Sequence, residues 1–416
     1  MKIKRFLNCS IPRGIVYHKI SSDIIALFMS FFSRLDDRKT IKQFENKFAE
    51  HIGRKYAIAF PFARVAIYYA LKIKNLPAGS EIIMPPITIK AILDVVIDLG
   101  LHPVFVDIDL DTLSFDAQKL DQAIGENTKA ILITYLFGIV PDIENMLSLC
   151  KKHNLFVIED FSQCLNGKYK NKKMGCFGDI GVYSASSIKT LDTYGGGLLV
   201  CDDDGMHQKL RYLQSTLEQP SRMYLIHKIL TDLIRNIATS RIVFHFMVFP
   251  LIKIMSALKP GGAIKHTGGR GQKMIKTLPQ AWFKQYTSYQ AKLGLKLLDS
   301  VEESDRARIN NVIYLKANIS SLPFPRGKSA ANNVYWQFVA LFENPIKAQE
   351  VMRKMGVDTS TTSLEMISSL SDYSCQGDTP NANYLYNNGL FIPSFPGLSM
   401  NDLKHISNVV NAVLDK

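Results

Sequence analysis

The sequence lacks several patterns that would each assign a protein to a class. It has no run of about 20 consecutive apolar residues, which excludes a multi-span membrane protein. None of its six cysteines forms a C-x-x-C pair, so we expect no zinc knuckle, no redox pair and no metal site. The 416 residues contain no internal repeat or low-complexity tract. With 47% hydrophobic and 21% charged residues, the chain is also unlike a disordered polyelectrolyte.

Acidic residues are scarce relative to basic ones, with 37 Asp and Glu against 50 Lys and Arg, so the formal net charge is +13. The excess lies in two segments: residues 1–42 hold 9 basic and 3 acidic residues, and residues 217–270 hold 8 and 2. The other 320 residues carry a net charge of only +1. Because the body of the chain is almost neutral, we exclude a uniformly basic nucleic-acid binder and expect no nucleic-acid partner.

The cysteines are widely scattered among apolar neighbours, which is typical of reduced, mostly buried thiols in a cytosolic protein. The N-terminus is basic, but Arg13 and Gly14 interrupt it before an apolar run reaches signal-peptide length. We therefore expect a cytoplasmic protein. The six cysteines are Cys9, Cys150, Cys164, Cys176, Cys201 and Cys375.

Between residues 43 and 205, predicted helices alternate with short apolar strands, which is typical of a largely parallel sheet covered by helices on both faces. Each predicted strand is followed by Pro, Gly or Asp, where ligand-binding loops lie in open α/β sheets. The expected helices are 66–73, 87–99, 116–124 and 143–153, and the expected strands are 81–84, 103–106, 130–136 and 156–159.

The pattern changes after residue 205. Residues 286–318 are amphipathic over their whole length, which predicts either one long helix or two helices in sequence. Further on, 334–342, a helix at 346–355 and 401–414 indicate a small α+β domain. The predicted segments are a basic and apolar N-terminal segment (1–42), a large domain (43–205), a basic amphipathic helical insertion (206–282) and a C-terminal small domain with its linking helix (283–416).

Three features of the strand-rich region together supply what pyridoxal phosphate (PLP) chemistry needs. Asp160 follows a buried strand, Lys189 follows a strand and a run of small polar residues, and Gly195–Gly197 make a turn. Singly, each has an ordinary explanation, as a helix cap, a surface lysine or a flexible turn. Jointly they provide a lysine for a Schiff base, a carboxylate for the pyridine nitrogen and small residues that can approach a phosphate.

Further motifs accompany these three in a fixed order. They are FE-x-x-FA at 44–49, 79–85, PVFVD at 103–107, TKA at 128–130, IED at 158–160, 175–179, 184–189, 289–294 and PSFP at 393–396. This ordered set resembles the DegT/DnrJ/StrS family, the PLP-dependent aminotransferases that act on keto sugars attached to nucleotides. The resemblance implies an α/β protein of PLP-dependent fold type I, the aspartate-aminotransferase-like fold, in which the large domain binds PLP and two copies form a homodimer.

The resemblance also implies an activity and a set of site residues. An amino group would pass from an amino acid, such as glutamate, to a nucleotide-linked keto sugar used in surface polysaccharide or lipopolysaccharide biosynthesis. Lys189 would be the Schiff-base lysine, and Asp160 would pair with the ring nitrogen. Gln163 would hydrogen-bond the ring hydroxyl, and Ser184 would contact the phosphate. A lysine at 189, where the family's dehydratase branch has histidine, argues against a dehydratase.

The chain departs from the family where the phosphate is bound. Ala63 and Arg64 lie in the stretch that corresponds to the family's Ser-Gly-Thr, and we expect Arg64 to replace the lost hydroxyl with a charge-assisted contact. A surface or interface arginine is the alternative. Ile89 stands in place of an aromatic that stacks on the ring, and 283–285 offers no counterpart of a phosphate-binding asparagine from the second subunit. These departures favour, as an alternative function, a PLP-binding regulatory protein without turnover.

The insertion combines an amphipathic helix predicted at 224–238 with an apolar stretch at 242–258. One interpretation is a helical hairpin packed on the body or on a partner subunit. The other is an in-plane element at an anionic membrane surface, which the similarly apolar helix expected at 20–35 also favours. In that case 217–270 makes peripheral membrane contact, the enzyme is membrane-associated, and the acceptor is a lipid-linked ketone.

Overall fold

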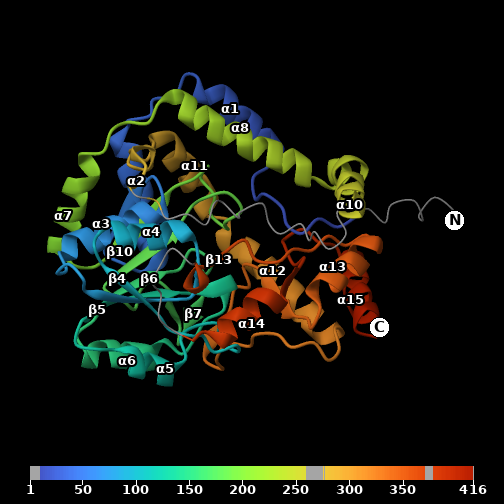
Figure 1. Cartoon of the computed structure of the whole chain (residues 1–416). Coiled ribbons are helices and arrows are strands. Elements are labelled where there is room, and N and C mark those ends of the chain that lie inside the picture. Colours follow the sequence, from blue (N-terminus) through green and yellow to red (C-terminus); the bar gives the residue numbers. More distant parts are fainter. Residues whose placement is uncertain (1–9, 259–274, 276, 371–377, 416) are drawn as a thin grey trace.

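The computed structural model of the protein describes residues 10–258, 275, 277–370 and 378–415. Cys9, Cys375 and residues 259–274 of the predicted insertion lie outside this range. Figure 1 shows an α/β body, a C-terminal group of helices beside it, and a pair of helices that crosses above the body. The arrangement of the strands in the body determines where a ligand can bind.

A seven-stranded sheet forms the centre of the body. The strand β10 runs antiparallel to both of its neighbours, and the remaining pairs are parallel, which confirms the predicted mostly parallel sheet. The parallel strands end at the same edge, so the loops that follow them lie together. In spatial order the strands are β1 (Tyr56–Phe60), β10 (Gly197–Cys201), β9 (Ile180–Ser184), β6 (Phe156–Asp160), β5 (Thr128–Thr134), β2 (Glu81–Met84) and β4 (His102–Phe105).

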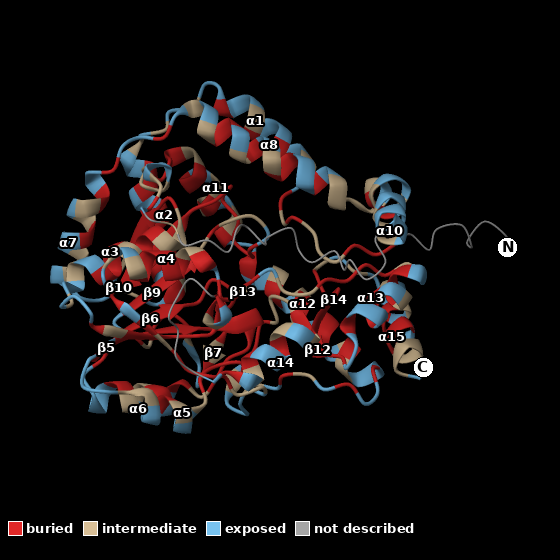
Figure 2. Cartoon of the chain, viewed as in Figure 1, coloured by how far each residue is buried: buried red, intermediate tan, exposed pale blue. Residues whose placement is uncertain are grey.

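The strands are buried on both faces because alternate side chains enter two separate cores. In β5, Ile131 and Ile133 lie in one core, whereas Ala130 and Leu132 lie in the other. Figure 2 shows the sheet as a buried layer between helices whose outer faces are exposed. One face is covered by α2 (Arg38–Ile52), α5 (Ala117–Ala123), α6 (Ile143–Lys152) and α11 (Ser288–Leu298), and the other by α3 (Ala63–Lys74), α4 (Lys90–Asp98) and α7 (Asp204–Ser215).

The C-terminal part has a core of its own around an antiparallel pair of strands, β12 (Phe338–Leu341) and β14 (Gly389–Ile392). Three helices pack on this pair: α12 (Val301–Asn318), α13 (Pro345–Lys354) and α15 (Met400–Leu414). Residues 286–318 form the two helices α11 and α12, so the second of the two interpretations is confirmed. The first of them begins at a capping box made by Thr287 and Gln290.

Two predicted boundaries in the body are wrong. The helix predicted at 87–99 begins only at Lys90, because Ile87–Thr88 form the short strand β3, which pairs with β13 (Glu365–Met366). The strand predicted at 130–136 ends at Thr134 and is followed by the 3₁₀ turn η1 (Leu136–Gly138). The segment 334–342, predicted to contribute to the α+β domain, contains the strand β12. The other short elements are β7 (Lys168–Tyr169), β8 (Lys172–Lys173), η3 (Gln280–Trp282), β11 (Ala331–Asn332), η4 (Ile367–Ser369) and α14 (Pro380–Asn388).

The helix pair above the body consists of α1 (Ile20–Ser30) and α8 (Arg222–Thr239), which lie side by side. The amphipathic helix predicted at 224–238 is therefore confirmed, while the one predicted at 20–35 ends at Ser30. Ala26 of α1 packs with Leu225 and Ile229 of α8, whereas Ile25 and Phe28 of α1 remain exposed.

The apolar stretch after α8 is also helical. It comprises α9 (Arg241–Val243), a π-helical turn η2 (Phe244–Val248) and α10 (Phe249–Leu258). Among the described residues, the helix Arg241–Leu258 is long and apolar enough by length and composition to cross a membrane, and only 11% of it is buried. Of these helices, α8 has a buried face, whereas Arg241–Leu258 is largely exposed.

Candidate active site

The predicted site residues from the sheet lie at one edge, where the parallel strands end. Asp160 is the last residue of β6, and Ser184 is the last residue of β9. Lys189 lies in the loop that joins β9 to β10, and Ala63 begins α3 directly after β1. Because β1, β10, β9 and β6 are consecutive neighbours, the fold brings these four residues to one end of adjacent strands.

Asp160 and Lys189 are both buried and act on each other electrostatically. Burial lowers the pKa of Lys189 to about 8, and the charge of Asp160 opposes this effect. Burial likewise raises the pKa of Asp160, against hydrogen bonding to Ser162, whose backbone N–H donates at 3.0 Å, and against the charge of Lys189. Among the described ion pairs none joins the two directly. A lysine with a pKa near 8 is partly neutral at physiological pH and can act as a nucleophile or a base.

The Lys189 side chain lies against an aromatic ring from the C-terminal part. Its Nζ is 3.6 Å from the centroid of the Trp336 ring, and the indole N–H of Trp336 donates to the carbonyl oxygen of Ile188 at 3.1 Å. Ile188 has a φ of 69°, which is strained for a β-branched residue and is the kind of strain found at functional sites. Sequence reasoning missed Trp336, since its contact with Lys189 is made across the chain and leaves no local pattern.

Gln163 and Ser184 are held by neighbouring loops. The Gln163 side-chain oxygen accepts a hydrogen bond from the backbone N–H of Phe137 at 2.8 Å, so its amide nitrogen is the end that could meet a ligand hydroxyl. The Ser184 hydroxyl lies 2.9 Å from that of Ser186, and the Ser184 N–H donates to Ser162 Oγ at 2.9 Å. Both residues are thus held in place by hydrogen bonds to other protein groups.

The start of α3 carries groups that can bind an anion. Phe62 precedes the helix and gives it no side-chain cap, and the backbone N–H groups at the start of a helix are a common place for an anion to bind. Gly197 passes so close that a Cβ there would lie 2.4 Å from Ala63 N. The guanidinium of Arg64 lies between two rings, 3.9 Å from the centroid of Phe62 and 4.1 Å from that of Trp282. A buried lysine, a carboxylate and this cationic helix start form a donor set that fits PLP.

The insertion helix α8 and the N-terminal segment form hydrogen bonds with the loop that carries Lys189 and with each other. Ser187 donates a hydrogen bond to Asp232 of α8. Asn236 Nδ2, one turn further along, donates to the His18 carbonyl and to Asp23 Oδ2, both at 2.7 Å. Tyr194 Oη donates to Asp23 Oδ1 at 2.8 Å. The polar face of α8 therefore covers the loop that carries the lysine.

This buried network holds strongly perturbed groups. Burial works to lower the pKa of His18, but its hydrogen bond with Asp23 and the charge of Asp192 outweigh burial and raise it to about 9. Burial raises the pKa of Asp192 to about 7, opposed by the charge of His18. His18 also lies 2.8 Å from the Asp192 carbonyl oxygen through Nε2. A charged His18 thus links the N-terminal segment to the loop.

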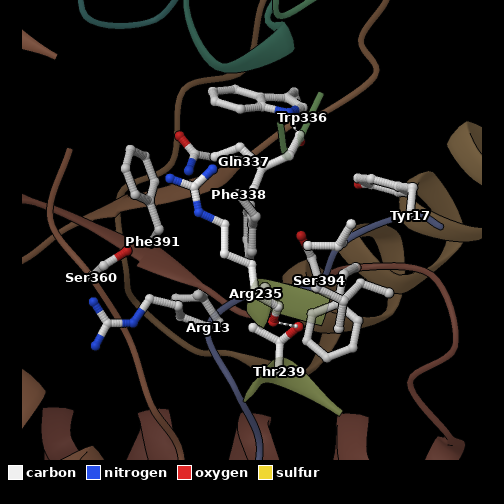
Figure 3. Close-up of a pocket in the computed structure, with 16 residues that line it drawn as sticks. Arg13, Tyr17, Arg235, Thr239, Trp336, Gln337, Phe338, Ser360, Phe391 and Ser394 are labelled. Carbon is white, nitrogen blue, oxygen red and sulfur yellow. Dashed lines mark hydrogen bonds between the residues drawn. The ribbon is translucent and has the colours of Figure 1, made fainter. Parts of the chain in front are cut away.

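A cavity of about 220 Å³ lies next to Lys189, at Ile188 and Trp336 (Figure 3). Its walls come from the N-terminal segment, from α8 and from the C-terminal part. They are mostly aliphatic or aromatic, but they include two arginines, Arg13 and Arg235. Arg13 makes two contacts with Asp358, at 2.6 and 3.0 Å, while Arg235 lies 3.4 Å from Asp232. Arg235 is therefore the less tightly held of the two cations.

Comparison with known proteins relates the chain to sugar-modifying enzymes. Residues 32–229 match the model of the DegT/DnrJ/EryC1/StrS aminotransferase family. A spore coat polysaccharide biosynthesis protein of Bacillus subtilis is 36% identical over 173 residues, 42% of this chain and 44% of that protein. A GDP-perosamine synthase of Caulobacter vibrioides is 36% identical over 184 residues, 44% of this chain and 50% of that protein. The matched region thus spans about half the length of these curated relatives.

A solved structure shows that the similarity of fold extends over the whole chain. The Helicobacter pylori aminotransferase PseC, which is involved in the biosynthesis of pseudoaminic acid, superimposes with a TM-score of 0.74 at 21% identity. The alignment covers 98% of this chain and 100% of that one. The predicted fold class, PLP-dependent fold type I, is therefore confirmed.

Proposed function

We propose that this chain, whose residues 32–229 match the DegT/DnrJ/EryC1/StrS aminotransferase family, is a PLP-dependent aminotransferase. It transfers an amino group from an amino acid to a keto sugar, as the names of its relatives suggest. The observation that carries this proposal is the buried pair Lys189 and Asp160, in which a lysine of lowered pKa lies within the electrostatic influence of a carboxylate at the end of the parallel strands.

Each residue of the site has a task in this reaction. PLP, when bound, supplies an electron sink for the negative charge that develops at the carbon beside the transferred nitrogen. Lys189, in its neutral form, would hold the cofactor and would move the proton at that carbon. Asp160 would accept a hydrogen bond from the ring nitrogen, and Gln163 would offer its amide nitrogen to the ring hydroxyl. We assign the Ser184 hydroxyl and the first N–H groups of α3, at Ala63 and Arg64, to the phosphate.

The substrates bind in the cavity beside Lys189. Arg235 provides a planar cation for the donor carboxylate or for the diphosphate of a nucleotide-linked acceptor. The apolar walls at Phe338 and Phe391 suit the less polar face of a deoxygenated sugar. We propose glutamate as the donor to test first and a nucleotide-linked keto sugar of surface polysaccharide biosynthesis as the acceptor.

The test follows the two halves of the reaction. Purified protein should show the visible absorbance band of lysine-bound PLP, and glutamate should abolish that band while 2-oxoglutarate appears. A keto-sugar nucleotide should then restore the band and gain an amino group, seen by mass spectrometry. If the band forms but no amino acid discharges it, the chain is a PLP-binding protein without turnover, and the proposed activity is wrong.

We propose two further properties of the intact enzyme. It forms a homodimer, which light scattering of the full chain tests. It also contacts anionic membranes, because η2 and α10 expose Met247, Leu251 and Met255 at 58 to 63% beside the cation Lys253. Vesicles containing phosphatidylserine should float the wild-type protein but not the double variant Leu251→Ser, Met255→Ser. A dimer that is lost in the same variant, without flotation of the wild type, would instead assign this surface to a second copy.

A further inference from the structure

Lys228 reaches from the insertion helix α8 to the first turn of α3. Its Nζ is 5.0 Å from the centroid of the Phe62 ring, and the Arg64 guanidinium lies 3.9 Å from the same centroid. A Cβ added to Gly195 would lie 3.6 Å from this Nζ, so the ammonium group lies over the glycine turn as well. Two cations from distant segments thus lie against one ring, beside the start of a 12-residue helix that has no side-chain cap.

This grouping concentrates positive charge. Burial, and after it the charge of Arg64, hold the pKa of Lys228 below its ordinary value. The helix start adds a partial positive charge of its own. The carboxylate with the strongest influence on Lys228 is Asp232, which accepts from Ser187 and pairs with Arg235 at 3.4 Å. No ion pair with Lys228 is found among the described residues. Such a site is complementary to a dianion.

Two hydrogen-bonded contacts of α8 hold this helix, and with it Lys228, in this position. Lys228 and Asp232 are four residues apart and so lie on one face of α8. Asp232 is bonded to Ser187, two residues before Lys189, and Asn236 on the same face is bonded to the N-terminal segment. The docking that covers the catalytic loop therefore also delivers Lys228 to the start of α3.

We propose that Lys228 is a ligand of the phosphate group of PLP, supplied by the insertion of the same chain. This inference rests on the proposed function and adds to it a phosphate-binding residue that lies on the insertion helix. It gives the insertion a chemical task, because Lys228 and Arg64 together neutralise the phosphate, and the helix N–H groups orient it. The nucleotide diphosphate of an acceptor shares this chemistry and is the competing ligand.

The experiment compares two cofactors that differ only in the phosphate. Full-length apoprotein carrying Lys228→Met is titrated with PLP and, separately, with pyridoxal, and binding is followed by absorbance without any substrate present. We expect the affinity for PLP to fall about 10- to 100-fold and the affinity for pyridoxal to stay unchanged. Lys209→Met, which removes an exposed lysine of α7, should change neither, and Lys228→Arg should restore most of the PLP affinity.

Three results would overturn the assignment. Equal losses for PLP and pyridoxal would make Lys228 a structural residue. If the PLP affinity is unchanged but the KM for the nucleotide sugar is raised, Lys228 binds the diphosphate of the acceptor and not the phosphate of PLP. If neither value changes, Lys228 binds no anion. If the Met variant fails to fold, Lys228→Gln, which keeps polarity and length, takes its place. Failure of the proposed function is a separate outcome, because wild-type protein would then either bind no PLP at Lys189 or hold PLP that no amino acid discharges.

Discussion

At the scale of single residues, the site depends on how burial shifts the pKa values of two groups of opposite charge. Lys189 loses part of its charge because it is buried, and Asp160 is the group that limits this loss. The resulting pKa of about 8 makes the amine usable near neutral pH, whereas a solvated lysine would be almost fully protonated. The two side chains therefore have to be tested together.

The first prediction concerns the pH dependence of cofactor attachment. Only the neutral amine attacks PLP, so the rate of attachment to apoprotein should rise with pH, reach half its maximum near the Lys189 pKa of about 8, and level off above it. Asp160→Asn removes the charge that raises this pKa, so the midpoint should move to lower pH. A stopped-flow pH series measures both, and a wild-type midpoint near the ordinary value of 10.5 would contradict the account.

The second prediction concerns the role of Asp160 after the cofactor is bound. Asp160→Asn should retain PLP but slow the reaction with the amino donor at least about 100-fold, because the ring nitrogen loses its anionic partner. The matched control Asp121→Asn changes an exposed carboxylate of α5 and should stay within about twofold of wild type. Single-turnover absorbance measures the rate, and a wild-type rate in Asp160→Asn would remove Asp160 from the mechanism.

The sequence indicated some of these residues and not others, for a physical reason. Asp160 and Ser184 end strands, and Lys189 follows one, so a local pattern places them at the edge of the sheet. Trp336 and Lys228 reach the site only through packing between distant segments, and a lone lysine on an amphipathic helix is indistinguishable from a solvated one. Contacts of this kind have no local signature.

At the scale of elements, α8 connects the insertion to the catalytic loop. Amphipathicity correctly predicted the helix, because Leu225 and Ile229 recur at helical spacing. It did not predict where the polar face would lie, and that face covers the loop through Asp232 and Asn236. The helix predicted at 87–99 shows a second limit of local sequence patterns. Its first residues form the strand β3 instead, because Glu365–Met366 pairs with them from far along the chain.

The third prediction tests how firmly α8 is docked. Asn236→Ala leaves the buried carboxylate of Asp23 without one of its donors and should lower the free energy of unfolding by about 1–3 kcal/mol. Thr231→Ala, on the same helix, removes only a bond to the His227 carbonyl and should stay within about 0.5 kcal/mol of wild type. Urea unfolding measures both. Equal stability of the two variants would mean that the bond from Asn236 to Asp23 contributes nothing to docking.

At the scale of the whole molecule, the positive charge belongs to two segments that come together in space. Residues 1–42 and 217–270 carry +6 each, and α1 and α8 lie side by side across the active-site loop. Part of this charge, on Lys228 and Arg235, faces the site, and part, such as Lys253, faces outward. The nearly neutral body carries the sheet and its two cores.

The fourth prediction concerns the thiols of the folded chain. The pKa of Cys150 is raised to about 12, those of Cys176 and Cys201 to about 11, and that of Cys164 is raised as well, in each case by burial. These four are free, buried thiols, as the composition predicted. No more than two of the six thiols should therefore react with Ellman's reagent in native protein near neutral pH, and all six in denaturant. Reaction of a third thiol in the native protein would contradict the burial of these four cysteines.

The most direct measurement is reductive trapping of the cofactor followed by peptide mass spectrometry. Borohydride should fix PLP on the peptide that contains Lys189 and on no other, and prior incubation with glutamate should abolish the label. The Lys189→Ala protein should carry no label under the same conditions. A label on a different lysine, or a label on Lys189 that no amino donor removes, would contradict the assignment of this chain as a PLP-dependent aminotransferase.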